Sequence, residues 1–409
     1  MPQWASFLVF FTIVTSIYSA GHYFIYSWLV RWAEPARPIR RAIQLSFVLL
    51  IISFPAARML AQVDFNPFTY SLTLVSSIWM GFVLYLVLLT LGMDLVWALL
   101  RVFSILGGKR LRLRVPTKRV LAVCMGLTVL SLGGVAWLEA HNLGATRLEI
   151  PLRGLPAEMD GFTVVQLSDL HYGMLTENGK LSRVMERVNE LRPDLIVITG
   201  DLVDEGVSHM EQMAQPLKLL KSRHGVLAVT GNHEYYAGVN RAVEIMKSAG
   251  IEVLRNEMKV LPSGLQFLGV DDPTGSRRMG DPAGDLEKQL SRLERGKPSI
   301  LLYHQPILFE KAASFGVGLQ LSGHTHGGQL YPIIYISRMI YPRILGLHEI
   351  GDSKLYVSRG AGTWGPPLRL GSPPEIVHIT LRSPKQGEGA KITSRGGFET
   401  RPYRVLSKG

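Results

Sequence analysis

The sequence has only one cysteine in 409 residues, few long apolar runs in its second part and no internal repeat. A single cysteine cannot form an intramolecular disulfide, so cysteine usage says nothing about an oxidising compartment. We interpret Cys124, which lies in an apolar run, as a small membrane-buried hydrophobe. Long apolar runs are scarce after about residue 140, and no internal repeat is found. The length allows two or three domains, the first of them strongly apolar.

Acidic residues are scarce in two short segments, and this explains most of the formal net charge of +12. Residues 31–41 have four arginines and one glutamate (+3), and residues 101–119 have seven Lys/Arg and no acid (+7). The tail from Ser383 adds +4, which leaves the remainder slightly negative. Because the positive charge is concentrated in loops between apolar stretches, we expect no nucleic acid among the partners.

The first 140 residues contain four stretches long enough to cross a hydrocarbon core of roughly 30 Å, which takes about 20 helical residues. The first lacks the basic start of a cleavable signal peptide, so we expect it to be retained. We interpret His22 as a helix-packing residue and Asp94 as interfacial. Residues 1–140 are therefore predicted to form a four-helix transmembrane module, with spans at Ala5–Val30, Ala42–Ala61, Leu72–Leu91 and Val120–Leu138.

The loops between these stretches predict an orientation. The loops after the first and third stretches contain eleven Lys/Arg, and the loop Val63–Thr69 contains none. The positive-inside rule places the two basic loops in the cytoplasm. With four spans, the N-terminus and everything after residue 140 then lie on the outer side of the plasma (inner) membrane. A different number of spans would reverse this orientation.

Residues 141–382 alternate short apolar runs with amphipathic segments, which is typical of a layered α/β domain with buried strands. Residues 383–409 are rich in Gly, Ser, Lys and Arg and are predicted to be a disordered basic tail. The predicted helices are Leu181–Leu191, Met210–Leu220, Arg241–Ala249 and Asp285–Leu293. The predicted strands are Phe162–Leu167, Leu195–Thr199, Val226–Thr230, Ile251–Leu254, Leu265–Val270, Ser299–Tyr303, Leu319–Leu321, Leu355–Ser358 and Glu375–Leu381.

Five polar motifs each follow one of these strands, at the end where open α/β sheets bind their ligands. Between them they supply carboxylate, amide and imidazole donors and no thiolate, a set that suits Mn²⁺, Fe or Zn²⁺. Seven ligands are too many for one ordinary site and fit two sites that share a bridging ligand. Two ions together can generate a hydroxide and stabilise a phosphoryl transfer. The seven candidate ligands are Asp169, His171, Asp201, Asn232, His304, His324 and His326.

The order of the motifs, D-x-H, GD-x-x-D, GN-H-E, a lone H and GH-x-H, resembles that of the calcineurin-like metallophosphoesterases. The resemblance covers about residues 145–382 and implies an αββα sandwich. Met159–Phe162, Gly323–Gln329 and Pro366–Ile376 are similar to the membrane-associated bacterial branch of these enzymes. Some members of that branch act on lipid-linked substrates such as UDP-2,3-diacylglucosamine.

The resemblance implies a hydrolase in which a hydroxide bridging two divalent ions attacks a phosphoester in line. His233 would then protonate the leaving alkoxide or stabilise its charge, and Asp204 and Glu234 would orient their neighbours. By the same resemblance Asp201 bridges the two ions. Asp169, His171, Asp201 and His326 would hold the first ion, and Asn232, His304 and His324 would complete the second.

Several alternatives stay open from the sequence. Asp204 fits a loop cap equally well, and we favour loop bracing over phosphate binding for Arg359 and Arg369, which flank Gly360–Pro367. Asp271–Asp272 is interpreted as a turn, and no motif surrounds His209, His224, His348 or His378. The alternative function is a non-catalytic phosphate sensor or scaffold coupled to the spans; a transporter is a weaker third. An outward-facing site would not meet a nucleotide-linked lipid made in the cytoplasm.

Overall fold

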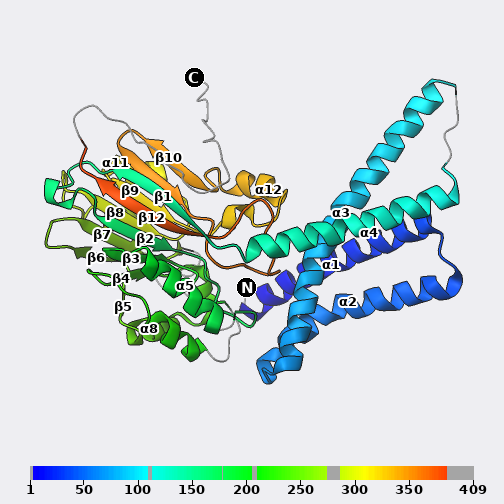
Figure 1. Cartoon of the computed structure of the whole chain (residues 1–409), viewed down its shortest axis with the longest axis horizontal. Helices are drawn as coiled ribbons and strands as arrows, with labels where there is room; N and C mark the ends of the chain where they lie inside the picture. Colours follow the sequence, from blue (N-terminus) through cyan, green and yellow to red (C-terminus); the bar gives the residue numbers. More distant parts are fainter. Residues whose placement is uncertain (1–2, 109–112, 177, 205–209, 274–285, 385–409) are drawn as a thin grey trace. The chain divides into compact units, whose positions relative to one another are not determined.

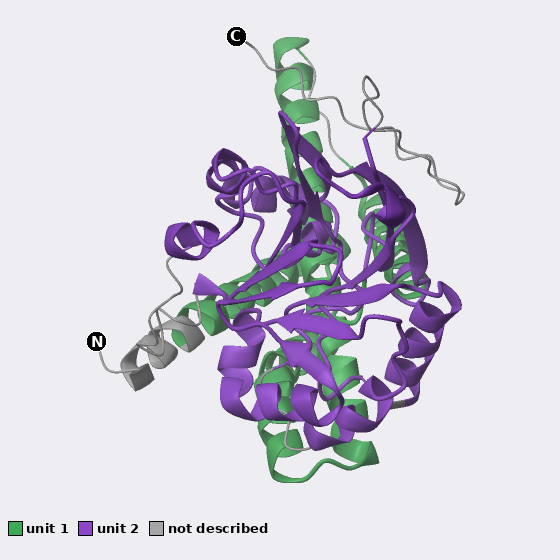
Figure 2. Cartoon of the chain, turned by 90° about the vertical axis from the view of Figure 1, so that its left-hand side faces the viewer, with its two compact units in different colours: residues 1–138, 365–368 green, residues 139–364, 369–409 purple. Residues whose placement is uncertain are grey.

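The computed structural model describes residues 3–108, 113–176, 178–204, 210–273 and 286–384. It divides the chain into two compact units (Figures 1 and 2). The first unit comprises residues 1–138 and 365–368, and the second residues 139–364 and 369–409. The predicted tail from residue 385 onward and His209 lie outside the described residues.

The first unit consists of long helices: α1 (Gln3–Ala33), α2 (Arg37–Val63), α3 (Pro67–Leu106) and α4 (Val115–Ala140). By length and composition, α2, α3 and α4 can cross a membrane, whereas α1 does not meet that criterion over its described residues. The predicted number of helices therefore agrees with the structure, and the number of candidate spans is three rather than four. At about 1.5 Å per residue, the 40 residues of α3 extend well beyond a bilayer core.

The two polar residues singled out in or beside the predicted spans, His22 and Asp94, have partners within this unit. His22 is buried, its Nδ1 lies 2.9 Å from the carbonyl of Tyr18, and its Nε2 accepts a hydrogen bond from Trp79. Asp94 accepts hydrogen bonds from Arg31 and from the indole of Trp32. Both residues therefore take part in helix–helix contacts.

The second unit contains two six-stranded sheets. The first sheet has the strand order β1-β12-β2-β3-β4-β5 and the second β10-β11-β9-β8-β7-β6. In the first, β2 (Thr163–Leu167), β3 (Leu195–Thr199), β4 (Val226–Val229) and β5 (Ile251–Val253) are parallel, flanked by β12 (Glu375–Arg382) and β1 (Gly144–Pro151). In the second, β7 (Gln266–Val270), β8 (Ser299–Tyr303), β9 (Leu319–Ser322) and β11 (Ser353–Val357) are parallel, flanked by β6 (Glu257–Val260) and β10 (Gly346–Ile350).

Alternate side chains of the strands point to opposite faces and build three hydrophobic layers. One layer lies between the sheets and joins residues such as Val197 of β3 and Leu302 of β8. The opposite face of β3 packs, through Ile198, on α5 (Asn178–Glu190) and α8 (Val239–Ser248). The opposite face of β8 packs on α10 (Leu286–Leu290) and α11 (Phe309–Ser314). This arrangement of helix, two sheets and helix is the predicted αββα sandwich.

The structure also has elements that the sequence did not predict. These include β1, β6 and β10, which lie at or beside sheet edges and have mixed polar and apolar residues. The predicted helix Met210–Leu220 is divided into a short 3₁₀ turn, η2 (Met210–Met213), and α6 (Ala214–Leu217). The most apolar unpredicted element is α12 (Ile333–Ile340), which is mainly exposed.

Candidate metal centre

The parallel strands bring the five polar motifs together. Asp169 and His171 follow β2, Asp201 follows β3, and Asn232 begins α7 (Asn232–Ala237) after β4. From the second sheet, His304 follows β8, and β9 leads to His324 and then to His326 in the 3₁₀ turn η3 (His326–Gly328). All seven candidate ligands are therefore located just after the carboxyl ends of five parallel strands, as the sequence predicted.

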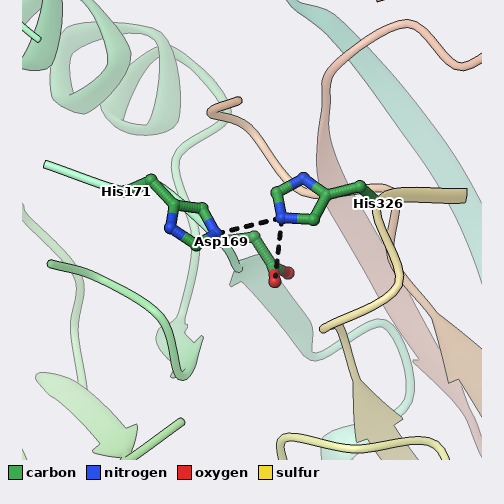
Figure 3. A group of neighbouring side chains, drawn as sticks. All are labelled: Asp169, His171 and His326. Carbon is green, nitrogen blue, oxygen red and sulfur yellow. Dashed lines mark hydrogen bonds and ion pairs between the residues drawn. The ribbon is translucent and has the colours of Figure 1, made fainter. Parts of the chain in front are cut away.

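Six of the seven candidate ligands, all but Asn232, form three clusters together with His233, and within each cluster the ligand atoms lie within 4.8 Å of one another. In the cluster drawn in Figure 3, the Nε2 atoms of His171 and His326 are 3.0 Å apart, and Asp169 Oδ1 is 3.7 Å from His326 Nε2. The others are His171–Asp201–His233 and Asp201–His304–His324. Neighbouring clusters have a residue in common, because the first two share His171 and the last two share Asp201.

A second observation, two buried oxygens without a hydrogen-bond donor, also indicates that the donor set fits metal ions. Asp169 Oδ2 and Asn232 Oδ1 are buried oxygens that accept no hydrogen bond in the described structure. A buried oxygen without a donor is costly, and a cation would satisfy it. His171 and His326 also direct imidazole nitrogens at one another, which is the arrangement expected of two ligands of one ion.

For two of the histidines, hydrogen bonds behind the clusters fix which ring nitrogen faces inward. His304 Nδ1 lies 2.7 Å from the carbonyl of Thr199, so this nitrogen is the donor and Nε2 faces Asp201. His324 Nε2 lies 2.8 Å from the hydroxyl of Tyr341, which leaves Nδ1 directed at His304. Partners of this kind set the tautomer and the ring orientation of a ligating histidine. No sequence motif indicated Thr199 or Tyr341.

The loops that contain the candidate ligands are tied to one another. The buried carboxylate of Glu234 accepts hydrogen bonds from the backbone N–H groups of Asp201, Leu202, Val203 and Gly231. The backbone N–H of His233 donates to Asp201 Oδ1 at 2.9 Å. Glu234 therefore joins the loop after β3 to the start of α7, and a neutral amide could not accept all these bonds equally well.

Asp204 lies beside two of the imidazoles. Its Oδ1 is 3.0 Å from His233 Nδ1 and 3.8 Å from His171 Nδ1. Burial alone would raise the pKa of Asp204, but its interactions with the two imidazoles hold the pKa far below the usual range. An ionised Asp204 is therefore placed to orient both rings.

The carboxylates and imidazoles of the centre shift one another's pKa values. Burial would raise the pKa of Asp201, yet His304, at 3.0 Å, holds it well below the usual range. Asp201 in turn raises the pKa of His304 to about 10 against the effect of burial. Burial, His171 and Arg369 hold the pKa of His326 well below its usual value, so this ring is neutral, the form that binds a metal.

Arg369 braces the loop that closes this side of the centre. Its side chain is wholly buried and donates to the carbonyls of Gly362, Ser372 and Arg359, while Nη2 lies 3.2 Å from His326 Nδ1. Burial lowers its pKa to about 10, so the guanidinium stays cationic at neutral pH. Of the two roles considered for this arginine, these contacts match bracing.

Other candidates from the sequence have partners that are not candidate ligands. Arg359 pairs with the buried Glu375, Asp271 pairs with Arg255, and Asp272 accepts from Gln305. His224, His348 and His378 belong to none of the three clusters found among the described residues.

Comparison with known proteins agrees with this geometry. A family model described as calcineurin-like phosphoesterase matches residues 162–328. An uncharacterized metallophosphoesterase of Aquifex aeolicus is 36% identical over 253 residues, which cover 61% of this chain and 96% of that protein. The chain belongs to the calcineurin-like metallophosphoesterases. This membership implies a metal-dependent phosphoesterase domain with divalent metal ions as cofactors.

Two further members of the family extend the comparison. A zebrafish (Danio rerio) protein named transmembrane protein with metallophosphoesterase domain is 38% identical over 247 residues, 58% of this chain and 56% of that protein. An uncharacterized metallophosphoesterase of Campylobacter jejuni is 29% identical over 395 residues, 93% of this chain and all of that protein. This chain thus spans just over half the length of the zebrafish relative. With its three candidate spans, it is a membrane protein of this family.

Proposed function

We propose that this chain is a membrane-anchored phosphohydrolase that cleaves a lipid-linked phosphoester with the help of two divalent ions. The observation that supports this most is that the three clusters share residues, and that Asp201 belongs to both the second and the third. A carboxylate shared in this way suits the role of a bridge between two ions. Asp169, His171 and His326 would hold one ion with Asp201, and Asn232, His304 and His324 would hold the other.

Bound ions would lower the pKa of water and neutralise the phosphate oxygens of the substrate. The chain's own residues would position the reaction. The backbone N–H of His233 fixes Asp201 through Oδ1, and Asp204 holds His233 at Nδ1. Nε2 of His233 is then the nitrogen that donates a proton to the leaving oxygen as the phosphorus–oxygen bond breaks. Asp204 stabilises the imidazolium that serves as this acid.

The test is hydrolysis of bis(p-nitrophenyl) phosphate and p-nitrophenyl phosphate by the purified full-length chain with Mn²⁺, Fe²⁺ or Zn²⁺. We expect Asp201→Ala to lose bound metal and turnover, and His233→Ala to lose turnover while it keeps its metal. His224→Ala, on the exposed His224, is the matched control and should behave like the wild type. Two bound ions without turnover of any phosphoester would instead support the sensor or scaffold.

The three candidate spans support a lipid-linked substrate, because they keep the second unit at a membrane. This unit, residues 139–364 and 369–409, is called the phosphoesterase unit below. The comparison to make is between the soluble nitrophenyl esters and a diacylated phosphoester in mixed micelles. UDP-2,3-diacylglucosamine serves here as an in vitro probe of the acyl chains, not as the expected substrate of an outward-facing site. A higher kcat/KM on the diacylated ester would support the proposal. Equal or lower kcat/KM would remove the lipid from it and leave the phosphoesterase.

We further propose that the phosphoesterase unit lies on the outer side of the plasma membrane, with α1 as a fourth span. The eleven Lys/Arg in the loops after the first and third predicted spans support this orientation. Tags at both termini of the chain should then be cleaved by protease added to spheroplasts. Cleavage of only one tag would contradict the four-span arrangement.

A further inference from the structure

The segment Tyr331–Ile340 has an apolar surface that no described part of the chain covers. The phosphoesterase unit has ten exposed large hydrophobic side chains among its described residues, and five lie in these ten positions. Met339 is 86% exposed, and α12 buries none of its residues. The helix has a single charged residue, Arg338, and no acidic one. The five exposed side chains are Tyr331, Tyr335, Ile336, Met339 and Ile340.

The start of this segment lies beside the residue with which the phosphoesterase unit begins. Leu330 forms a parallel bridge with Leu370, and the Tyr331 N–H donates to the Leu370 carbonyl. The next residue, Gly371, donates its N–H to the carboxylate of Glu139 at 3.1 Å. In sequence, Glu139 is in the last turn of the candidate span α4. The residues just before α12 are therefore connected, through Leu370 and Gly371, to the end of the candidate span α4.

The composition of the segment suits the lipid–water interface. The segment has two tyrosines, three long aliphatic side chains and one arginine, all but Tyr331 on the short helix, and this combination is found where a helix lies in the headgroup region. An interface with a second protein would be expected to contain more polar groups around its rim. Glu139, which accepts from Gly371, belongs in sequence to the last turn of a candidate span, and this connection favours lipid as the partner of the segment.

We propose that α12 lies in the lipid–water interface of the membrane in which the spans of this chain are embedded. Its exposed face contacts the acyl-chain boundary, and Arg338 faces the headgroups. The proposal rests on the candidate spans and not on phosphoesterase activity. It has a consequence for the metal centre, because η3 ends five residues before α12 and Tyr341, which contacts His324, follows it directly. The segments on both sides of α12, which contain His326 and Tyr341, would then be held at the level of the lipid headgroups.

The test uses the full-length chain in nanodiscs of phosphatidylethanolamine with a minor fraction of phosphatidylglycerol. Cys124 is first replaced by Ser, and a fluorophore is attached to Met339→Cys. The matched control is Val260→Cys, which puts the label at an exposed apolar residue of β6 that is 40% exposed. We expect nitroxide-bearing lipids to quench the label at Met339→Cys severalfold more than at Val260→Cys, and aqueous iodide to do the reverse. Ile336→Asp in the Met339→Cys chain should reduce the quenching by lipid.

Two outcomes would overturn the proposal. Equal quenching by iodide at both positions, with no effect of nitroxide lipids, would show that α12 is in water. Protection of Met339→Cys from both quenchers would show that protein covers it. A change of that protection with the number of chains per nanodisc would then identify a second copy, and no change would identify the chain's own helices.

Discussion

At the scale of single residues, the metal centre is built on strained backbone. Five of the seven candidate ligands have φ between +47° and +73°, in the left-handed region that residues with a side chain rarely adopt. Each such residue costs on the order of 1–3 kcal/mol unless its surroundings enforce it. Asp and His adopt positive φ somewhat more readily than most residues, but this preference is too weak to remove the strain. Metal ions bound by these residues would offset it. The five residues are Asp169, His171, Asp201, His324 and His326.

Gly231 offers a test of how closely the backbone must approach a ligand. A Cβ at this position would lie 2.2 Å from Asp201 Oδ1 and 2.6 Å from Asp201 N, although its φ of −101° is accessible to alanine. Gly231→Ala should therefore displace Asp201, and a shift of about 1 Å can lower kcat/KM about 100-fold. Metal content and kcat/KM are the measurements.

The control for this variant is Gly179→Ala. A Cβ there would have Arg183 Nη1, at 3.9 Å, as its closest neighbour outside the adjacent residues. We expect wild-type metal content and activity from it. A Gly231→Ala protein that retained both would show that the loop after β4 can move away from Asp201.

At the scale of an element, the loop from Arg359 to Ser372 depends on one side chain. Arg369 supplies hydrogen bonds to three carbonyls of this loop through a planar fork that lysine lacks. Arg369→Lys should keep the charge, leave buried carbonyls unsatisfied at about 1–3 kcal/mol each, and loosen the loop beside His326. We expect a lower melting temperature and a lower kcat/KM. Arg382→Lys, at a residue whose side chain is 40% exposed, should change neither.

Strand β12 predicts a pH dependence of stability. Burial would raise the pKa of Glu375, but the guanidinium of Arg359, at 2.7 Å, and the hydroxyl of Thr146 hold it below the usual 4.5. Because the folded-state pKa is lowered, the ionised carboxylate stabilises the fold above about pH 4.5. This stabilisation is lost as the pH falls through the lower, folded-state pKa.

Glu375→Gln should therefore be less stable than the wild type by about 3–5 kcal/mol at pH 7, because it leaves Arg359 without its buried partner. The difference should shrink below pH 4.5, as measured by denaturation at several pH values. For Glu149→Gln, whose partner Arg382 is exposed, we expect less than about 1 kcal/mol at every pH. A constant difference for Glu375→Gln would contradict the lowered pKa.

Much of this arrangement could be predicted from the sequence because its signals are local. A buried strand such as β3 is a continuous apolar run, and the ligand motifs follow such runs directly. The edge strand β1 was missed because it has no continuous apolar run and because its partner, β12, is more than 200 residues away. Tyr341 and Thr199 were missed for a related reason, since only the folded chain brings them to a histidine.

At the scale of the whole molecule, the two units have different sources of stability. The helices α2, α3 and α4 are apolar enough for a bilayer to stabilise them. The phosphoesterase unit has its own cores between and outside its sheets, and its loops converge on buried carboxylates and imidazoles. Metal ions should therefore affect the stability of one unit and leave the other unchanged.

Removal of metal tests this division. An ion that binds only the folded state, at 1,000 times its Kd, stabilises that state by about 4 kcal/mol. Chelation should lower the unfolding temperature of the phosphoesterase unit, followed through its β-sheet signal, and leave the helical signal of the spans unchanged. Asp201→Ala should show a much smaller shift, because its binding site is already incomplete. An equal shift in both proteins would mean that the metal acts elsewhere, and a loss of helix on chelation would mean that the two units unfold together.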